Sequence, residues 1–276
     1  MTDNAAWFTR NSSARRAEQS LAVCEGKTIH QFTDRWNTIP RYSIALDLLA
    51  RKAQWLENMQ YFRAACREIA SATNERTAIA AILPPRVLCG HTICVERRPA
   101  QRSSVHALIL VGLMNSFSFD WLLRQKAATH VSLYLLADLP LPELSEEADR
   151  FLAHGCLRLS CNHAAFAPLW REQLGDAWRE NTVRHSWPVV ATDHDRWYLR
   201  AAMDAVVAQA YGLDHTQYAR VLSSFSHRSC KAAPQLCLEA FARLAHEGLA
   251  GFCRQHDPYD DIPPVTAIAA PVITLQ

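Results

Sequence analysis

Residues 105–124 read VHALILVGLMNSFSFDWLLR, and this stretch decides the fold class. Apolar side chains occupy most of its positions and helix-breaking residues are few, so the pattern predicts one largely buried helix over Val105–Arg124. Its apolar part, Val105–Met114, is too short to span a bilayer and is interrupted by His106 and Gly112. The character of the chain changes near Ser103, with strand-like patterns before it and helical patterns after it.

The segment before this helix is typical of short strands joined by turns. An alternation of apolar and polar residues predicts strands at Lys27–Phe32 (KTIHQF) and Thr92–Arg97 (TICVER). Thr77–Leu83 (TAIAAIL) is a continuous apolar run, which predicts a buried strand that ends at Pro84. Between these strands, Ile44–Asn58 has helical spacing. Residues 1–20 are polar and lack periodicity, so we expect a flexible lead-in.

After the central helix the pattern is helical almost to the end of the chain. We expect Val131–Leu136 to be extended. Helices are predicted over five later ranges: Leu144–Leu159, Ala164–Trp178, Arg196–Tyr211, His215–Phe225 and Pro234–Phe252. Several prolines follow Asp257, which predicts an extended arm that packs back on the body. The sequence therefore predicts an α+β protein with a lead-in (1–20), a strand-rich region with a buried helix (21–142), a helical region (143–256) and an extended Pro-rich tail (257–276).

The composition is that of a globular protein. Hydrophobic residues make up 49% and charged residues 20% of the 276 positions, which gives no compositional case for disorder. The N-terminal sequence has no apolar core of the kind that a signal peptide needs. We therefore expect a cytoplasmic protein that does not associate with membranes.

The nine cysteines are scattered and never form a CxxC motif. Two pairs, Cys89/Cys94 and Cys156/Cys161, have CxxxxC spacing, and His154 and His163 flank the second pair. Zinc is therefore an alternative, although zinc sites usually have tighter spacing and a second paired cluster. We favour reduced cysteines that serve as small buried apolar residues, and we expect no metal site.

Charge is distributed unevenly along the chain. Residues 1–130 carry 17 Lys and Arg against 10 Asp and Glu, whereas residues 131–276 carry 12 against 17. A basic first half indicates contact with a polyanion. Arginine outnumbers lysine by 25 to 4, and its planar guanidinium suits phosphates and guanine edges. A GC-rich genome would give the same arginine bias without functional meaning.

The common catalytic signatures are missing from the sequence. The eight glycines form no GxGxxG, FxGxG or phosphate-loop motif for a nucleotide or S-adenosylmethionine. The two Pro-Pro pairs lack the polar leader and the aromatic follower that hold a flipped base in amino-methyltransferases. There is also no GxSxG, no HExxH and no nuclease-like arrangement of acids and lysine. The acidic stretch His256–Asp261 (HDPYDD) is a possible metal ligand set, but its prolines favour a turn that anchors the tail.

Several stretches resemble the C-terminal target-recognition region of TaqI-like, type IIG adenine-specific DNA methyltransferases, a group that includes methyltransferases of phage-defence systems. The similar words are, in order, Glu25–Phe32 (EGKTIHQF), Pro40–Tyr42 (PRY), Thr73–Thr77 (TNERT), Leu113–Asp120 (LMNSFSFD), Leu123–Lys126 (LRQK), Leu135–Pro142 (LLADLPLP), Met203–Ala205 (MDA), Tyr211–Leu213 (YGL) and Asp257–Tyr259 (DPY). Single words are weak signals, but their order covers nearly everything from residue 21 onward. In the full-length enzymes this region follows a cofactor-binding catalytic domain, which is missing from this sequence.

The resemblance implies a DNA target-recognition module in which residues 21–142 form the recognition region. Its partners would be double-stranded DNA and a separate methyltransferase chain, and S-adenosylmethionine would bind to that chain. The expected DNA-binding residues are Arg41, Tyr42, Asn74, Arg76, Thr77, Arg124 and Lys126. No residue of this chain is expected to be catalytic.

The side-chain chemistry of these residues suits contact with DNA, but a structural role is the alternative interpretation for several of them. Arg76 is suited to reading guanine and Asn74 to pairing with adenine, unless Glu75 and Arg76 form a surface ion pair and Asn74 caps a turn. Arg41 and Tyr42 offer a guanidinium for a phosphate and a ring for stacking. Arg124 and Lys126 lie at the end of a predicted helix, where cations are favoured in any case.

Three other functions remain open from the sequence. The chain is alternatively a protein-interaction module of a defence complex without DNA affinity, with the acidic helical half as the docking face. It is alternatively an inactive gene fragment. A third alternative is an enzyme of unfamiliar chemistry that uses Cys156, Cys161, His163 or the Asp257–Asp261 turn.

Overall fold

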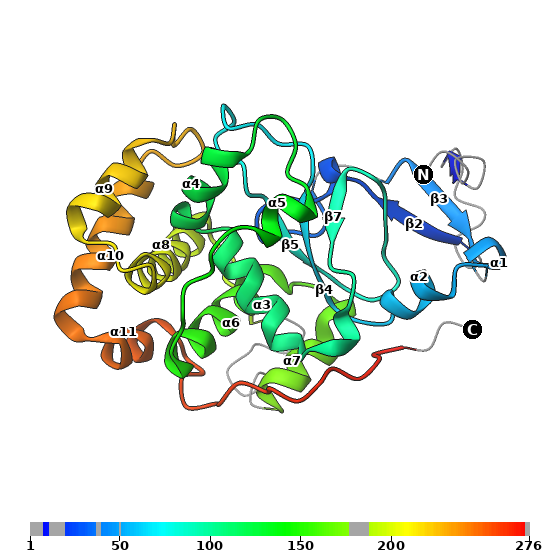
Figure 1. The fold of residues 1–276 in the computed structure, drawn as a ribbon. Helices are drawn as coiled ribbons and strands as arrows, with labels where there is room; N and C mark the ends of the chain where they lie inside the picture. The colour runs from blue at the N-terminus through cyan, green and yellow to red at the C-terminus, as the bar shows by residue number, and fades with distance from the viewer. Residues whose placement is uncertain (1–7, 11–19, 37–39, 50, 177–187, 274–276) are drawn as a thin grey trace.

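The computed structural model describes residues 8–10, 20–36, 40–49, 51–176 and 188–273 (Figure 1). It confirms the predicted α+β class, with strands in the N-terminal part and helices in the C-terminal part. Residues 1–7 and 11–19 of the expected lead-in lie outside the described residues, and Phe8–Arg10 within it form strand β1.

The strands form two small sheets. The first has the order β1-β3-β2-β6, built from Phe8–Arg10, Tyr42–Ala45, Ser20–Cys24 and Leu88–Cys89. The second has the order β5-β4-β7, built from Ala80–Leu83, Arg63–Arg67 and Ile93–Val95. All neighbours are antiparallel except β2 and β6, which pair in parallel. Strands are present within both predicted ranges: β5 starts three residues later than predicted and ends at Leu83 as predicted, and β7 is shorter at both ends.

The predicted helix over 105–124 is in fact two helices. Helix α3 covers Ser104–Met114 and α4 covers Phe117–Lys126, with a bend of 73° between them. Asn115 interrupts the helix because its side chain bonds the backbone of Ala80 in β5, accepting at 3.0 Å and donating at 2.9 Å. Ser116 then caps α4 by accepting a hydrogen bond from the Phe119 amide at 3.1 Å. The prediction of a buried segment holds, and the prediction of one helix was wrong.

Two shorter predictions were also wrong. Lys27–Phe32 is not a strand: Gly26–Thr28 form a 3-10 helix with Glu25 and Thr28 as a capping box, and Phe32 has a φ of 59°. Val131–Leu136 is not extended, because Ser132 caps helix α5 over Leu133–Ala137. In both places local hydrogen bonds between a hydroxyl side chain and the backbone, which the Thr28 and Ser132 hydroxyls make, override the apparent alternation.

The region predicted to be helical at 44–58 is divided. Tyr42–Ala45 form β3, and two short helices follow, α1 (Leu46–Leu49) and α2 (Ala53–Asn58). A 3-10 turn, η4 (Pro99–Gln101), leads from the second sheet into α3. The main core cluster begins in this half and continues into the helical half, with α3 packed on β4, β5 and α6.

The helical half agrees well with the sequence pattern. Its elements are α6 (Glu146–Ser160), η5 (Ala164–Phe166), α7 (Ala167–Leu174), α8 (Asp193–Ala210), α9 (His215–Ser223), α10 (Ala233–Glu247) and α11 (Leu249–His256). The predicted helix at 234–252 is split at Gly248, whose φ of 72° ends α10. Helix α8 lies close to α3 and α6 because Gly112 and Gly155 leave room for Met203, and a Cβ at Gly155 would lie 2.6 Å from its sulfur.

The tail returns along the body to the N-terminal half (Figure 1). The Asp257–Asp261 turn anchors it, because Asp257 pairs with His154 at 2.6 Å and Asp260 with Arg150 at 3.4 Å. Further on, the Ala269 amide donates to Arg102 and the Val272 amide to Gln60. Among the described residues no single helix is long and apolar enough to cross a membrane; α3 and α4 together pass that test by composition but are sharply bent.

Candidate nucleic-acid interface

The loop of residues 68–79, which joins β4 to β5, carries three of the residues singled out from the sequence. Its tip, Thr73 and Asn74, is exposed. Arg124 of α4 holds this tip in place, since its Nη2 donates to the carbonyl oxygens of Asn74 at 2.6 Å and Glu75 at 2.7 Å. The loop is therefore fixed to a helix that lies far away in the sequence.

Asp120 of α4 organises the base of the loop. Its carboxylate is 0% exposed and accepts from Arg76 Nε at 2.7 Å and from the amides of Thr77 and Ala78 at 3.1 Å. Arg76 Nη2 also donates to the carbonyl oxygens of Asn115 and Ser116, at 2.6 and 2.7 Å. This buried pair is well compensated, because each charged group has several hydrogen bonds besides its ionic partner.

Aromatic rings and a second anchor complete the support. The guanidinium carbon of Arg76 lies 4.1 Å from the centre of the Phe117 ring, and that of Arg124 lies 3.9 Å from the centre of the Phe225 ring. Glu75 accepts hydrogen bonds from the amide and hydroxyl of Ser229, at 2.8 and 2.6 Å. Burial opposes ionisation of Glu75, but these bonds outweigh it and lower the pKa of the carboxyl.

The structure thus brings Asn74, Arg76, Thr77 and Arg124 together, as expected for residues of one site. Their roles differ from the prediction. Arg76 is 7% exposed and Thr77 0% exposed, so neither side chain reaches a ligand on the surface. The predicted direct contact of these two residues with DNA is corrected: they fix the loop from inside. Arg124, whose side chain is 10% exposed, has the same supporting position.

The remaining predicted residues lie apart from this network. Lys126, in the last turn of α4, pairs with Asp138 and stays partly exposed. Arg41 lies beside β3 and pairs with Glu25 at 3.3 Å. Tyr42 is part of β3 and packs against the cluster of Leu21, Val23 and Ile44, so its ring is not freely available for stacking. Tyr42 thus belongs to the first sheet and Arg41 lies directly before it, and neither residue is part of the loop.

An exposed surface adjoins the loop. We call it the rim and define it as Trp121, Gln125, Lys126, His130 and Tyr134, all of which are exposed. Trp121 and Gln125 share a face of α4, and Tyr134 in α5 is 85% exposed. A bridge between Ile69 and His130 and a 2.7 Å bond from the Val131 amide to the Glu68 oxygen tie the rim to the base of the loop. Exposed aromatic and basic side chains therefore lie beside a rigidly held loop.

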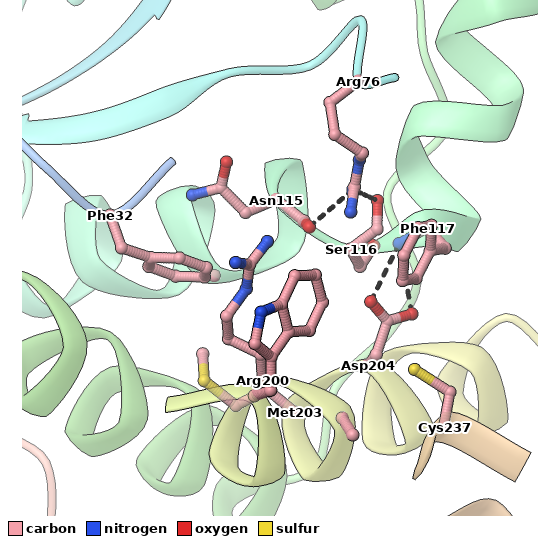
Figure 2. Close-up of a pocket in the computed structure, with 12 residues that line it drawn as sticks. Phe32, Arg76, Asn115, Ser116, Phe117, Arg200, Met203, Asp204 and Cys237 are labelled. Atoms are coloured by element: carbon pink, nitrogen blue, oxygen red, sulfur yellow. Dashed lines mark hydrogen bonds between the residues drawn. The ribbon is translucent and has the colours of Figure 1, made fainter. Parts of the chain in front are cut away.

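A small pocket lies on the other side of Arg76. Arg76 and Arg200 of α8 enter it from opposite sides, and Asp204 lies near Phe117 (Figure 2). Asp204 accepts from the Phe117 amide at 3.0 Å and from the Tyr218 hydroxyl at 3.1 Å. Burial raises the pKa of Asp204 to about 6, although Arg76 and these hydrogen bonds act in the opposite direction. The enclosed space is only about 10 Å³, which is room for about one water molecule.

The sequence left open a zinc site at the cysteines and a metal site at the Asp257–Asp261 turn. In the described part of the chain, neither place has a group of ligands for a metal ion. No three His, Cys, Asp or Glu residues there are placed to hold a metal ion. Cys156 and Cys161 are buried, and burial raises the pKa of both thiols. The flanking histidines pair elsewhere, His154 with Asp257 and His163 with Asp34.

Sequence reasoning missed three residues of this region. Asp120, Asn115 and Arg200 connect segments that are 35 to 169 positions apart. The first two lie in the quoted word LMNSFSFD, where polar residues interrupt an apolar helix, and this interruption was the available signal. Arg200 gives no comparable signal in the sequence. Comparison with known proteins found no family model, curated protein or solved structure that matches this chain.

Proposed function

We propose that this chain is a DNA target-recognition module that acts with a methyltransferase on another chain. The observation that supports this best is the exposed loop tip at Thr73 and Asn74, held by a buried network of Asp120, Arg76 and Arg124. A reading loop benefits from such support because its side chains must be held in place before binding.

The side chain of Asn74 is chemically suited to base recognition. An asparagine amide donates and accepts on one plane, which matches the N6 and N7 edge of adenine in the major groove. The backbone of Asn74 is fixed by Arg124 and by a hydrogen bond from its amide to Ser71 at 3.0 Å, while its side chain is exposed. We assign Asn74 as the base-reading residue of the loop.

The rim supplies contacts of the kind that nucleic-acid backbones use. Lys126 and His130 can approach phosphates, Gln125 offers an amide, and the rings of Trp121 and Tyr134 offer flat apolar faces. Phosphate contacts would give affinity without sequence preference, whereas the loop tip would give the preference. The excess of basic residues in the first 130 positions agrees with this arrangement.

Methyl transfer would belong to the partner chain. The pocket between Arg76 and Arg200 is small and faces two guanidinium groups, which is a poor match to the positively charged sulfonium of S-adenosylmethionine. The chain also carries no glycine-rich cofactor motif. The partner is therefore expected to hold the cofactor and the catalytic residues.

A selection from a pool of random DNA duplexes at low salt tests the proposal. The wild-type chain should enrich a sequence, and its affinity should fall at least about tenfold between 50 and 200 mM salt. Asn74→Ala should broaden the enriched sequence, Lys126→Gln should weaken binding to all sequences, and the control Asn162→Ala, which changes another exposed asparagine, should do neither. Failure to retain any duplex would refute the proposal.

A second candidate function has one observation in its favour. Tyr134, Ile69 and Leu141 are large apolar side chains that are more than half exposed, which is also expected of a protein-docking face. A stable complex with a protein from the native host, formed without DNA and lost on Tyr134→Ser, would favour an assembly module.

A further inference from the structure

The connection between α9 and α10, residues 224–232, borders the loop of residues 68–79. The amide and the hydroxyl of Ser229 both donate to the carboxylate of Glu75, at 2.8 and 2.6 Å, and Glu75 directly follows the loop tip at Asn74. Figure 1 shows the connection and the loop side by side next to α4. A segment of the helical half, 154 positions from Glu75, therefore lies beside the loop tip.

This connection is held in a defined shape. His227 has a φ of 45°, a conformation that favours glycine and that other residues keep only where their surroundings hold them. Its Nε2 donates to the carbonyl oxygen of Leu222 at 2.7 Å, and its ring centre lies 5.2 Å from that of Phe117 in α4. The connection is thus fixed to the same helix that carries Asp120 and Arg124.

Positive charge gathers here, against the trend of this half of the chain. Residues 131–276 carry 12 Lys and Arg against 17 Asp and Glu. Residues 215–238, by contrast, contain Arg220, Arg228 and Lys231 and no Asp or Glu. The segment that borders the loop is therefore basic, although the helical half as a whole is acidic.

Two of these cations are free to meet an anion. Arg228 and Lys231 are exposed, and neither forms an ion pair with any of the described residues. Glu75 is not their partner, because its carboxylate is held by Ser229 and lies near the buried Arg76. Their charges are therefore not compensated within the described part of the protein.

Basic side chains consequently lie beside both limbs of the loop. The rim, which carries Lys126, is tied to the first limb by the hydrogen bond from the Val131 amide to the Glu68 oxygen. The α9–α10 connection is tied to the second limb at Glu75. A loop tip that enters the major groove, which is about 12 Å wide, has a phosphate backbone on either side of it.

We infer that the α9–α10 connection binds one phosphate backbone of a DNA duplex through Arg228 and Lys231, while the rim contacts the other backbone. This inference rests on the proposed function, since it takes the loop tip as the part that enters the groove. Phosphate contacts fix the position of a protein on the duplex and carry no sequence information. The helical half therefore contributes affinity and orientation, and the loop tip contributes the sequence preference.

Titration of the full chain with a labelled DNA duplex of random sequence, between 50 and 200 mM salt, tests this contact. Arg228→Gln and Lys231→Gln each remove one exposed charge. The matched control is Arg254→Gln, because Arg254 is also exposed and forms no ion pair within the described ranges, but lies in α11. The 15 residues of α10 separate α11 from the connection by about 22 Å.

Each variant of the connection should bind the duplex roughly tenfold more weakly at 100 mM salt, and the slope of log affinity against log salt should fall by about one. The sequence enriched from a random pool should stay the same, and Arg254→Gln should behave as wild type.

Three other results would overturn the inference. Binding by both variants that equals that of wild type removes the contact and leaves the proposed function intact. A changed enriched sequence with an unchanged salt slope means that these residues contact bases and not phosphates. If the wild-type chain retains no duplex, the inference fails together with the proposed function.

Discussion

Asp120 connects segments of the protein that are far apart in the sequence. Asp120 lies in α4, yet its carboxylate bonds a guanidinium and two amides of the loop at 68–79. It is also 3.6 Å from Arg124, which fixes the loop tip. One buried carboxylate therefore connects the helix, the loop and both arginines, and the exposed position of Asn74 depends on it.

Replacing Asp120 should be costly. Asp120→Asn leaves Arg76 buried without a counter-charge, and breaking a buried pair in this way costs about 3–5 kcal/mol. Urea unfolding should show a lower midpoint with an unchanged slope. The control Asp138→Asn breaks the exposed pair with Lys126 and should change the midpoint little. A loss for Asp120→Asn no larger than that of the control would show that Asp120 does not hold the loop.

Asp204 should make stability depend on pH. Its pKa is raised from 3.8 to about 6, so folding favours the protonated form, and this contribution is present at low pH and lost as pH rises from about 4 to about 6. Asp204→Asn removes the titration while keeping an acceptor for the Phe117 amide. The stability of the variant relative to wild type should rise by about 1–3 kcal/mol across this window.

Urea unfolding of both proteins at a series of pH values measures this difference. The comparison with the variant is needed because His30 and His256 titrate in the same range with the opposite sign. Their pKa values are lowered to about 4, so they stabilise the folded state as pH rises. A difference between the proteins that is constant with pH would rule out a raised pKa for Asp204.

At the scale of elements, hydrogen bonds between distant segments set where helices end. Asn115 ends α3 because its amide pairs with the backbone of Ala80 as a strand neighbour would. The sequence contains the apolar run and the capping serine, but it does not show that β5 lies opposite Asn115. The position of the bend is therefore set by tertiary structure.

The variant Asn115→Ala tests the contact between Asn115 and Ala80. The buried Ala80 amide loses its acceptor, whereas the Ala80 carbonyl oxygen keeps the Phe32 amide as a donor at 3.0 Å; an unsatisfied buried group costs about 1–3 kcal/mol. Hydrogen exchange at the Ala80 amide should become much faster. Exchange at Ile82, which also lies in β5 and pairs with Ala64 of β4, should change less. The control Ser145→Ala removes a helix cap from α6 and should leave Ala80 protected. Unchanged protection of Ala80 in Asn115→Ala would contradict the contact.

How far the sequence predicts each element follows from the range of its interactions. Helices α6, α8 and α9 are predicted well because apolar spacing and the caps Ser145, Thr192 and Asp214 are local. The strand predicted at 27–32 fails because the capping box at Glu25 and Thr28 competes with alternation. The candidate site is predicted only in part: four of its residues were named, but their burial depends on Asp120, which is 44 positions from Arg76.

At the scale of the whole molecule, the tail joins parts that are distant in the chain. It is anchored on α6 by the buried pair of Asp257 and His154, and it then bonds Arg102 and Gln60 near the second sheet. The basic first half and the acidic helical half are thus held together by a strap as well as by the shared core. The two ends of the strap should contribute unequally to stability.

Two truncations separate these contributions. Ending the chain after residue 262 removes the hydrogen bonds of Ala269 and Val272 and should lower stability by about 1–3 kcal/mol, since each bond contributes about 0.5–1.5 kcal/mol. Ending it after residue 256 also leaves His154, whose Nε2 has no hydrogen-bond partner, without Asp257, and removes the buried ring of Tyr259. This second loss should be larger, because a buried polar ring is left without its partner and a buried aromatic ring is removed. Urea unfolding of both truncated chains measures the two losses, and equal losses would show that the Asp257 anchor is not the main attachment.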